Sequence, residues 1–192
     1  DFSANKNEGI AVDWPVRYKD IAPWYDKVES YIGVSGENLG LPQLPDGQFE
    51  PMMELNCVED HVRGKVAEHF GGRVITAGRV AHINSDKQFD GDGRVRCQFR
   101  NRCIRGCPFG AYFSSVSSTL PAAEATGNMT LRPDSIVHEV IYDPNTKKAT
   151  GVKVIDRETK EEFEFKAKVI FLCASAIAST SILMQSKSDR FP

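Results

Sequence analysis

The alternation of apolar and polar residues predicts two helices in the first part of the chain. Apolar side chains recur at three- and four-residue steps over 17–32, which is the period of a helix with one apolar face. Pro23 falls in the early turns of this segment, so we expect the helix to begin at Asp20 or Ala22. The second helix is expected near 56–70, and Gly71-Gly72 directly after this segment are expected to end it.

The segments around these two helices have weaker patterns. Residues 1–16 are expected to be irregular, and 36–51 are rich in glycine and proline, which indicates a long loop. Weak alternation over 74–83 favours a strand, and 113–125 are typical of a further helix. This part of the chain is therefore predicted to consist of helices joined by long connections.

The last third of the chain has the pattern of a sheet. Four segments alternate like antiparallel strands, with turn sequences after the second and the third: 129–131, 136–142, 150–156 and 162–166. Consecutive antiparallel strands joined by short turns form a β-meander.

The period changes after this meander. Residues 168–174 form a continuous apolar run, which predicts a strand buried on both faces, with Cys173 as a small apolar residue of its core. Small residues then lead into a helix expected over 177–186. A meander, a buried strand, a turn of small residues and a helix are typical of the late part of a dinucleotide-binding domain. A plain α/β packing unit has the same pattern.

Composition and charge exclude several classes of protein. The chain of 192 residues is 41% hydrophobic and 26% charged, an ordinary globular composition, and its formal net charge of −2 gives no support for nucleic-acid binding. No apolar run approaches the roughly 18 residues that cross a bilayer, so no transmembrane segment is expected. The chain opens on Asp1, without a methionine or a signal peptide, which indicates a piece of a longer protein.

Three of the five cysteines lie close together in the sequence. Cys97, Cys103 and Cys107 are six and four residues apart, in a stretch that also contains the arginine cluster from Arg94 to Arg105. Three thiolates on one short loop suit an iron–sulfur cluster better than a structural zinc ion, which normally takes four protein ligands. A disulfide with one free thiol, a zinc site and no ligand at all are the alternatives. Cys57, next to a predicted helix, is interpreted as a packing residue.

Three stretches carry a more specific signal. They are the residues from Asp13-Trp14-Pro15 to Gly36, those from Cys107-Pro-Phe-Gly-Ala to Gly127-Asn128, and the ending from Ala149 to Ser186. In this order they resemble the middle part of the glucose–methanol–choline (GMC) oxidoreductases. The Cys-x5-Cys-x3-Cys loop is similar to that of the iron–sulfur-containing bacterial sugar dehydrogenases of this family, of the FAD glucose, fructose and glucoside 3-dehydrogenase type.

The resemblance implies a fold, a reaction and two cofactors. The fold is mixed α/β and α+β, with a partial FAD-binding Rossmann-like domain and part of a substrate domain. The implied enzyme oxidises a CH–OH group of a sugar or glucoside: FAD takes a hydride and a histidine accepts the hydroxyl proton. Electrons then pass through a [3Fe-4S] cluster to a cytochrome-type acceptor, and a small accessory subunit is a further partner. A non-catalytic fragment or interaction domain and a cluster-free GMC oxidase are the rival hypotheses.

The resemblance also assigns site residues. It implies that the three cysteines bind the cluster and that four residues lie at the FAD: Val137, Ala174, Ser175 and Ser179. The family usually has glycine where Ser175 stands. The arginines between the cysteines either raise the cluster's potential, face solvent or bind an acidic partner. The histidines match no catalytic position and are interpreted as surface or structural residues: His61, His69, His82 and His138.

Three regions follow from this assignment. Residues 1–85 are predicted to be part of the substrate domain or cap, 86–127 the cysteine loop and a connecting helix, and 128–192 part of the FAD-binding domain. The sequence has neither a Gly-x-Gly-x-x-Gly motif nor the family's catalytic histidine, so we expect this segment alone not to turn over substrate. The related sugar dehydrogenases act on the periplasmic side of the membrane, which is the expected location, with the cytoplasm as the alternative.

Overall fold

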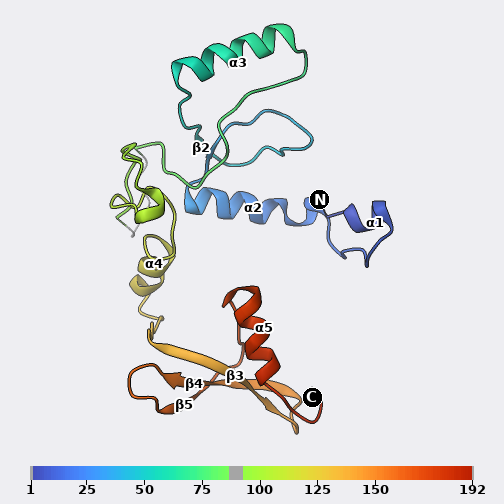
Figure 1. Ribbon diagram of the computed structural model, residues 1–192, viewed down its shortest axis with the longest axis vertical. Helices are drawn as coiled ribbons and strands as arrows, with labels where there is room; N and C mark the ends of the chain where they lie inside the picture. The colour runs from blue at the N-terminus through green and yellow to red at the C-terminus, as the bar shows by residue number, and fades with distance from the viewer. Residues whose placement is uncertain (1, 87–92, 192) are drawn as a thin grey trace. The chain divides into compact units, whose positions relative to one another are not determined.

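The computed structural model describes residues 2–86 and 93–191 and divides into two units (Figure 1). The first unit is Asp1–Met129 and the second is Thr130–Pro192. Residues 87–92, which belong to the predicted cysteine-loop region, lie outside the described residues.

The helices predicted over 17–32 and near 56–70 are confirmed. Helix α2 spans Tyr18–Ile32 and α3 spans Cys57–His69, and a short helix α1 (Ala4–Glu8) precedes them in the segment expected to be irregular. Helix α2 begins before Asp20 because the Asp20 carboxylate accepts a hydrogen bond of 2.8 Å from the Arg17 N–H and so caps the first turn. At α3, the Asn56 side chain accepts hydrogen bonds from two backbone N–H groups of the first turn. Cys57 is exposed, so its predicted packing role is wrong.

The long loop over 36–51 is confirmed and is closed by two very short parallel strands. These are β1 (Ser35–Gly36) and β2 (Glu50–Pro51). Inside the loop, one oxygen of the Asp46 carboxylate accepts the backbone N–H groups of Leu39 and Gly40 at 2.9 and 3.0 Å. The Asp46 side chain therefore supplies the hydrogen-bond acceptor that a neighbouring strand would supply to backbone N–H groups in a sheet.

Two further predictions for the first unit are wrong, one for a strand and one for the extent of a helix. The strand expected over 74–83 does not form, and among the described residues this segment makes only isolated bridges, at Val80 and His82. Helix α4 covers Thr119–Ala125, only the second half of the predicted helix. Its first half is a turn, because the Ser114 and Ser117 hydroxyls hydrogen-bond to each other and to backbone groups that a helix would use.

The second unit contains the predicted meander. Strands β3 (Ser135–Asp143), β4 (Lys148–Asp156) and β5 (Glu162–Lys166) form an antiparallel sheet in this order, whereas residues 129–131 are not a strand. Helix α5 (Ser175–Gln185) lies against β3, where Ile182 is buried and the Val140 N–H donates to the Ser186 hydroxyl at 2.8 Å (Figure 1). The mixed α/β class is confirmed.

The buried strand predicted over 168–174 is absent from the part of the chain described. The Ala167 N–H, directly before the segment, donates to the Thr150 carbonyl at 3.0 Å, but no described residue of 168–174 belongs to a strand or a bridge. Val169, Phe171 and Cys173 are exposed, so a core role for Cys173 is wrong in this structure. A strand buried on both faces needs neighbouring strands, and the three-stranded meander does not extend to it.

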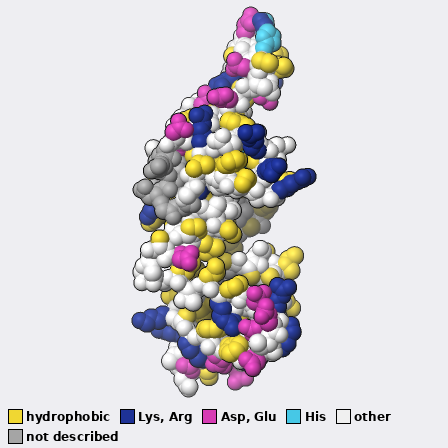
Figure 2. All heavy atoms as spheres, turned by 90° about the vertical axis from the view of Figure 1, so that its left-hand side faces the viewer, with side chains coloured by type: hydrophobic (Ala, Val, Ile, Leu, Met, Phe, Trp, Pro, Cys, Tyr) yellow, Lys and Arg dark blue, Asp and Glu magenta, His cyan; other side chains and the backbone are white. Residues whose placement is uncertain are grey.

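The surface is mixed in character. On the face drawn in Figure 2, hydrophobic side chains lie open to solvent between charged side chains of both signs. Within the described residues, no helix combines the length and the apolar character that crossing a membrane requires.

Candidate cofactor sites

The three clustered cysteines line one cavity of the first unit. Cys97, Cys103 and Cys107 are half-buried and face a space of about 270 Å³, together with Met53 and His82 from other segments. Cys103 begins a single 3-10 turn, Cys103–Arg105, between the other two. All five cysteines are free thiols, so the disulfide alternative is not formed.

The backbone around the cavity is held by pairing between distant segments. The Cys97 N–H donates to the Ile83 carbonyl at 2.9 Å, and the Ile83 N–H donates to the Ala111 carbonyl at 3.0 Å. Ile83 and Ala111 are fully buried. The cysteine loop is therefore anchored at both of its ends to the same segment of the core, near Ile83.

Backbone N–H groups surround the Cys107 thiol. Burial raises the pKa of this thiol, but hydrogen bonds from four N–H groups together lower the pKa below its usual range. The donors belong to Phe109, Gly110, Ala111 and Tyr112. Cys97 has one such donor, the Phe99 N–H at 3.4 Å. The four donors around Cys107 favour its thiolate, which is the form that binds metal.

Arg94 is the buried member of the arginine cluster. Its side chain donates to the Gly110 carbonyl at 2.9 Å and to the Ile32 carbonyl, at the end of α2, at 2.8 Å. Gly110 has φ of +61°, and a Cβ there would lie 3.1 Å from the Arg94 side chain. Arg94 therefore positions the turn after Cys107. In the sequence Arg94 is one of several clustered arginines and nothing marks it as a positioning residue, because the carbonyl groups to which it donates are distant along the chain.

The other arginines of the loop differ from Arg94. Arg100, Arg102 and Arg105 are exposed, and Arg96 is half-buried.

His82 was also missed by the sequence reasoning. Its ring packs on the Tyr112 ring, with centroids 4.8 Å apart, and burial lowers its pKa. Its Nε2 atom is buried and has no hydrogen-bond partner among the described residues. The sequence carries no signal for this placement, since His82 precedes the first cysteine of the loop by 15 positions.

The three cysteines line a common space. In the described part of the chain, no group of three or more His, Cys, Asp or Glu side chains is arranged to hold one metal ion. A single zinc ion draws its ligands to one centre at about 2.3 Å per sulfur. A cluster of several irons takes each thiolate on a different iron, so its ligands lie around a larger volume. Three thiols that line one cavity are the donor set that such a cluster takes.

The predicted FAD residues lie in the second unit. Ala174 and Ser175 form the turn into α5, and the Ser179 hydroxyl donates to the Leu172 carbonyl at 3.5 Å. Ser175 has φ of +67°, the left-handed region that glycine adopts without strain. This conformation explains why glycine suits this position. Val137 lies on β3, opposite Val154 of β4. Ala174, Ser175 and Ser179 therefore lie at the N-terminal end of α5, and Val137 belongs to the adjoining sheet.

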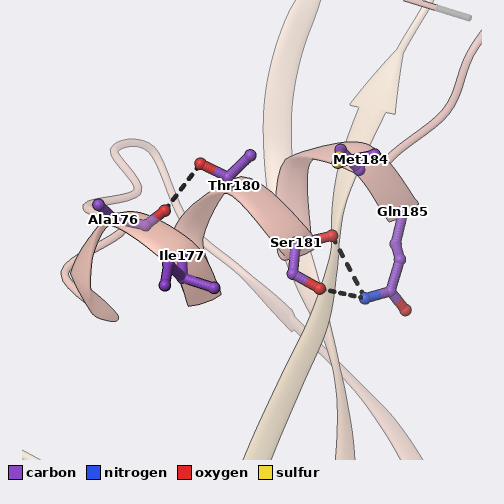
Figure 3. Close-up of a pocket in the computed structure, with 6 residues that line it drawn as sticks. All are labelled: Ala176, Ile177, Thr180, Ser181, Met184 and Gln185. Atoms are coloured by element: carbon purple, nitrogen blue, oxygen red, sulfur yellow. Dashed lines mark hydrogen bonds between the residues drawn. The ribbon is translucent and has the colours of Figure 1, made fainter.

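A further hollow of about 660 Å³ follows one side of α5 (Figure 3). Its polar side chains bond within the helix: the Thr180 hydroxyl donates to the Ala176 carbonyl, and the Gln185 amide donates to Ser181. Ile177 and Met184 supply its apolar part and are exposed. The hollow is an uncovered helix face rather than a set of polar groups directed at a ligand.

Comparison with known proteins agrees with the sequence resemblance. The chain is similar to 2-methyl-1,2-propanediol dehydrogenase of Mycolicibacterium austroafricanum, with 26% identity over 100% of this chain and 34% of that protein. It is 23% identical to the fructose dehydrogenase large subunit of Gluconobacter japonicus, over 100% of this chain and 34% of that protein. It is 26% identical to 6'''-hydroxyparomomycin C oxidase of Streptomyces lividus, over 96% of this chain and 33% of that protein.

The chain thus spans about a third of the length of these relatives. The profile of the family described as GMC oxidoreductase matches residues 11–188, nearly the whole chain. The N-terminal domain of this family binds FAD, and the meander with α5 agrees with part of a Rossmann-like domain. The chain therefore belongs to the GMC oxidoreductase family.

Proposed function

We propose that this chain is a segment of an FAD-dependent dehydrogenase that oxidises a CH–OH group of a sugar or glucoside. In this proposal, electrons leave through a [3Fe-4S] cluster to a cytochrome-type acceptor. The observation that carries it is the single cavity lined by the free thiols of Cys97, Cys103 and Cys107. The relatives named above support the reaction class, since each is named as a dehydrogenase or an oxidase.

The cluster would be held by the three cysteine thiolates. It supplies a one-electron carrier, which is needed when a two-electron flavin serves a one-electron haem acceptor. The N–H groups after Cys107 stabilise its thiolate, and Arg94 fixes the turn that carries them. The exposed side chains of Arg100 and Arg102, on the same loop, add positive charge beside the cavity.

The FAD would be held by the second unit. The turn at Ala174 and Ser175 presents backbone N–H groups at the start of α5, where negative charge is favoured. Val137 contributes backbone from β3. No histidine of this segment is assigned as the base that accepts the substrate's hydroxyl proton, and the roles proposed here for the cysteines and the turn into α5 concern the cofactors alone.

The test uses the full-length protein purified without oxygen. The wild-type protein should contain iron and inorganic sulfide in the ratio of a [3Fe-4S] cluster. Cys103→Ser should leave flavin reduction by the sugar intact and abolish reduction of a cytochrome acceptor. Cys57→Ser is the matched control, because Cys57 is exposed on α3, and both activities should survive.

Two results would overturn this proposal. One is an iron-free wild-type protein that passes electrons to oxygen and forms peroxide, which the cluster-free oxidase hypothesis expects. The other is cytochrome reduction that Cys103→Ser leaves unchanged.

A further inference from the structure

The exposed face of the cysteine loop carries an excess of positive charge. Residues 93–123 contain five arginines and no lysine, aspartate or glutamate, whereas the whole chain has a net charge of −2. Arg94 is buried and serves the fold, but Arg100, Arg102 and Arg105 are exposed. None of these three is in an ion pair with another described residue. The loop is therefore a local basic surface on a chain of net negative charge.

Apolar side chains lie among these charges. Ile104, between Arg102 and Arg105 in the sequence, is 92% exposed, and Phe99, next to Arg100, is 58% exposed. Phe99 also has φ of +52°, which is unfavourable for a bulky side chain, and its ring is too exposed for core packing to offset this. Aromatic residues and arginine are enriched at protein–protein interfaces. The composition of this surface is therefore that of a contact surface.

The basic surface adjoins the thiols. It shares residues with the cavity of about 270 Å³, which is lined by Phe99, Arg100 and Arg102 as well as by the three cysteines. Ile104 and Arg105 belong to the 3-10 turn that Cys103 begins. A protein bound to this surface would therefore lie beside the cavity in which the thiols meet.

Charge distinguishes this surface from the apolar faces of the chain. Helix α5 contains no charged residue, and its Ile177 and Met184 are exposed, so a protein core can cover that face without burying charge. Permanent burial of three arginines is costly unless every guanidinium is paired. A reversible, hydrated contact avoids most of this cost, because the charges remain close to water. The basic surface thus suits a transient partner better than a core contact.

We propose that Arg100, Arg102, Arg105 and Ile104 form the docking surface for an acidic electron-transfer protein, the one-electron acceptor. This inference rests on the proposed function and adds to it where the acceptor binds and which charge it carries. Carboxylates on the acceptor face the arginines, and an apolar part of its surface contacts Ile104. Attraction between opposite charges speeds association at low ionic strength, and a small, hydrated interface allows rapid dissociation.

The test compares two acceptors that have the same haem and opposite charge. Cytochrome c is basic, and succinylation of its lysines makes it acidic. At about 0.01 M ionic strength, the full-length protein should bind succinylated cytochrome c at least about tenfold more tightly than unmodified cytochrome c. This preference should disappear at about 1 M, where charges are screened over a few ångströms. Surface plasmon resonance measures both affinities without turnover.

Two variants with equal loss of charge show whether the loop itself is responsible. Replacing Arg100, Arg102 and Arg105 together with Gln should weaken binding of succinylated cytochrome c by about tenfold or more. The matched control replaces three exposed lysines of the second unit with Gln and should weaken binding by less than about twofold. These lysines are Lys147, Lys148 and Lys187.

A third variant tests the apolar part of the surface. Ile104→Ser should weaken binding of succinylated cytochrome c by about fivefold. Flavin reduction by the sugar and thermal unfolding should not change, because the Ile104 side chain contributes almost nothing to the core. Unchanged binding in this variant would overturn the role of Ile104.

Several results would overturn the docking surface. Equal binding of the two cytochromes is one, and equal losses in the arginine and lysine variants are another. Phosphatidylglycerol vesicles that bind through the arginines, without binding of succinylated cytochrome c, would identify a lipid surface as the occupant. Protection of the three arginines from phenylglyoxal in the full-length protein would show that the rest of the same protein covers them.

Failure of the proposed function is distinguishable from failure of this inference. A wild-type protein without iron would refute the proposed function, whichever cytochrome it binds. An iron-containing protein that binds both cytochromes equally would refute the docking surface alone.

Discussion

The guanidinium of Arg94 donates a hydrogen bond of 2.8 Å to the backbone carbonyl of Ile32, across 62 positions of sequence. The same side chain donates to the Gly110 carbonyl at 2.9 Å and is only 3% exposed. It thereby joins the end of α2 to the turn that follows Cys107. One buried cation satisfies carbonyl groups of two segments that have no backbone ladder between them.

Replacing Arg94 with Met should destabilise the first unit. The change leaves the Ile32 and Gly110 carbonyls without their donor, and we expect a loss of about 3 kcal/mol. Hydrogen exchange of the backbone amides near Ile83 and Ala111 measures the free energy of local opening. Arg105→Met removes an exposed arginine of the same loop and should change that energy by less than about 0.5 kcal/mol. Equal effects of the two substitutions would contradict a special role for Arg94.

Replacing Ser175 with Gly should stabilise the second unit. Ser175 has φ of +67°, which is unfavourable for a residue with a Cβ, so relief of strain should outweigh the added freedom of the unfolded chain. We expect a net gain of about 0.5 kcal/mol, measured by chemical denaturation. Ser181→Gly, in the body of α5, is the control and should cost about 0.5 kcal/mol. A loss of stability in both variants would show that Ser175 is unstrained.

The ion pair between Arg63 and Glu37 should make the first unit sensitive to acid. One Arg63 nitrogen donates to both Glu37 oxygens, at 2.8 and 2.9 Å, and the Thr76 hydroxyl donates to one of them at 3.0 Å. Hydrogen bonding from Arg63 lowers the pKa of Glu37 below its ordinary range. Because the pKa of Glu37 is lower in the folded protein than in the unfolded chain, the ion pair stabilises the fold at pH values above the unfolded pKa of about 4.3. This stabilisation is lost as the pH falls through the folded pKa.

Arg63→Met measures this contribution. At pH 7 the variant should lose about 1 kcal/mol of stability relative to wild type, and the difference should shrink once the pH falls well below about 4. Lys65→Met removes an exposed partner of Glu68 on the same helix and should have little effect at either pH. Denaturation curves at pH 7 and at pH 3 check both expectations. A difference that is the same at both values would contradict the pH dependence.

Local patterns predicted the elements whose stability is local. Helices α2 and α3 and the meander β3–β5 were found because their periods, caps and turns lie within a few residues of one another. The errors fall where an element depends on distant partners. The apolar run over 168–174 has the composition of a buried strand, but strand formation needs a neighbouring strand, which local composition does not supply.

The same distinction applies to the candidate site. The spacing of Cys97, Cys103 and Cys107 on one short segment, and the order of the family's motifs, were readable in the sequence alone and predicted the kind of chemistry to expect. Only the tertiary structure brought Met53 and His82 to the thiols and assigned Arg94 to the carbonyls of Ile32 and Gly110. The physical reason is that the spacing of cysteines on one loop depends only on neighbours along the chain, whereas the groups that orient and surround this loop are brought there by packing and hydrogen bonding between segments far apart in sequence.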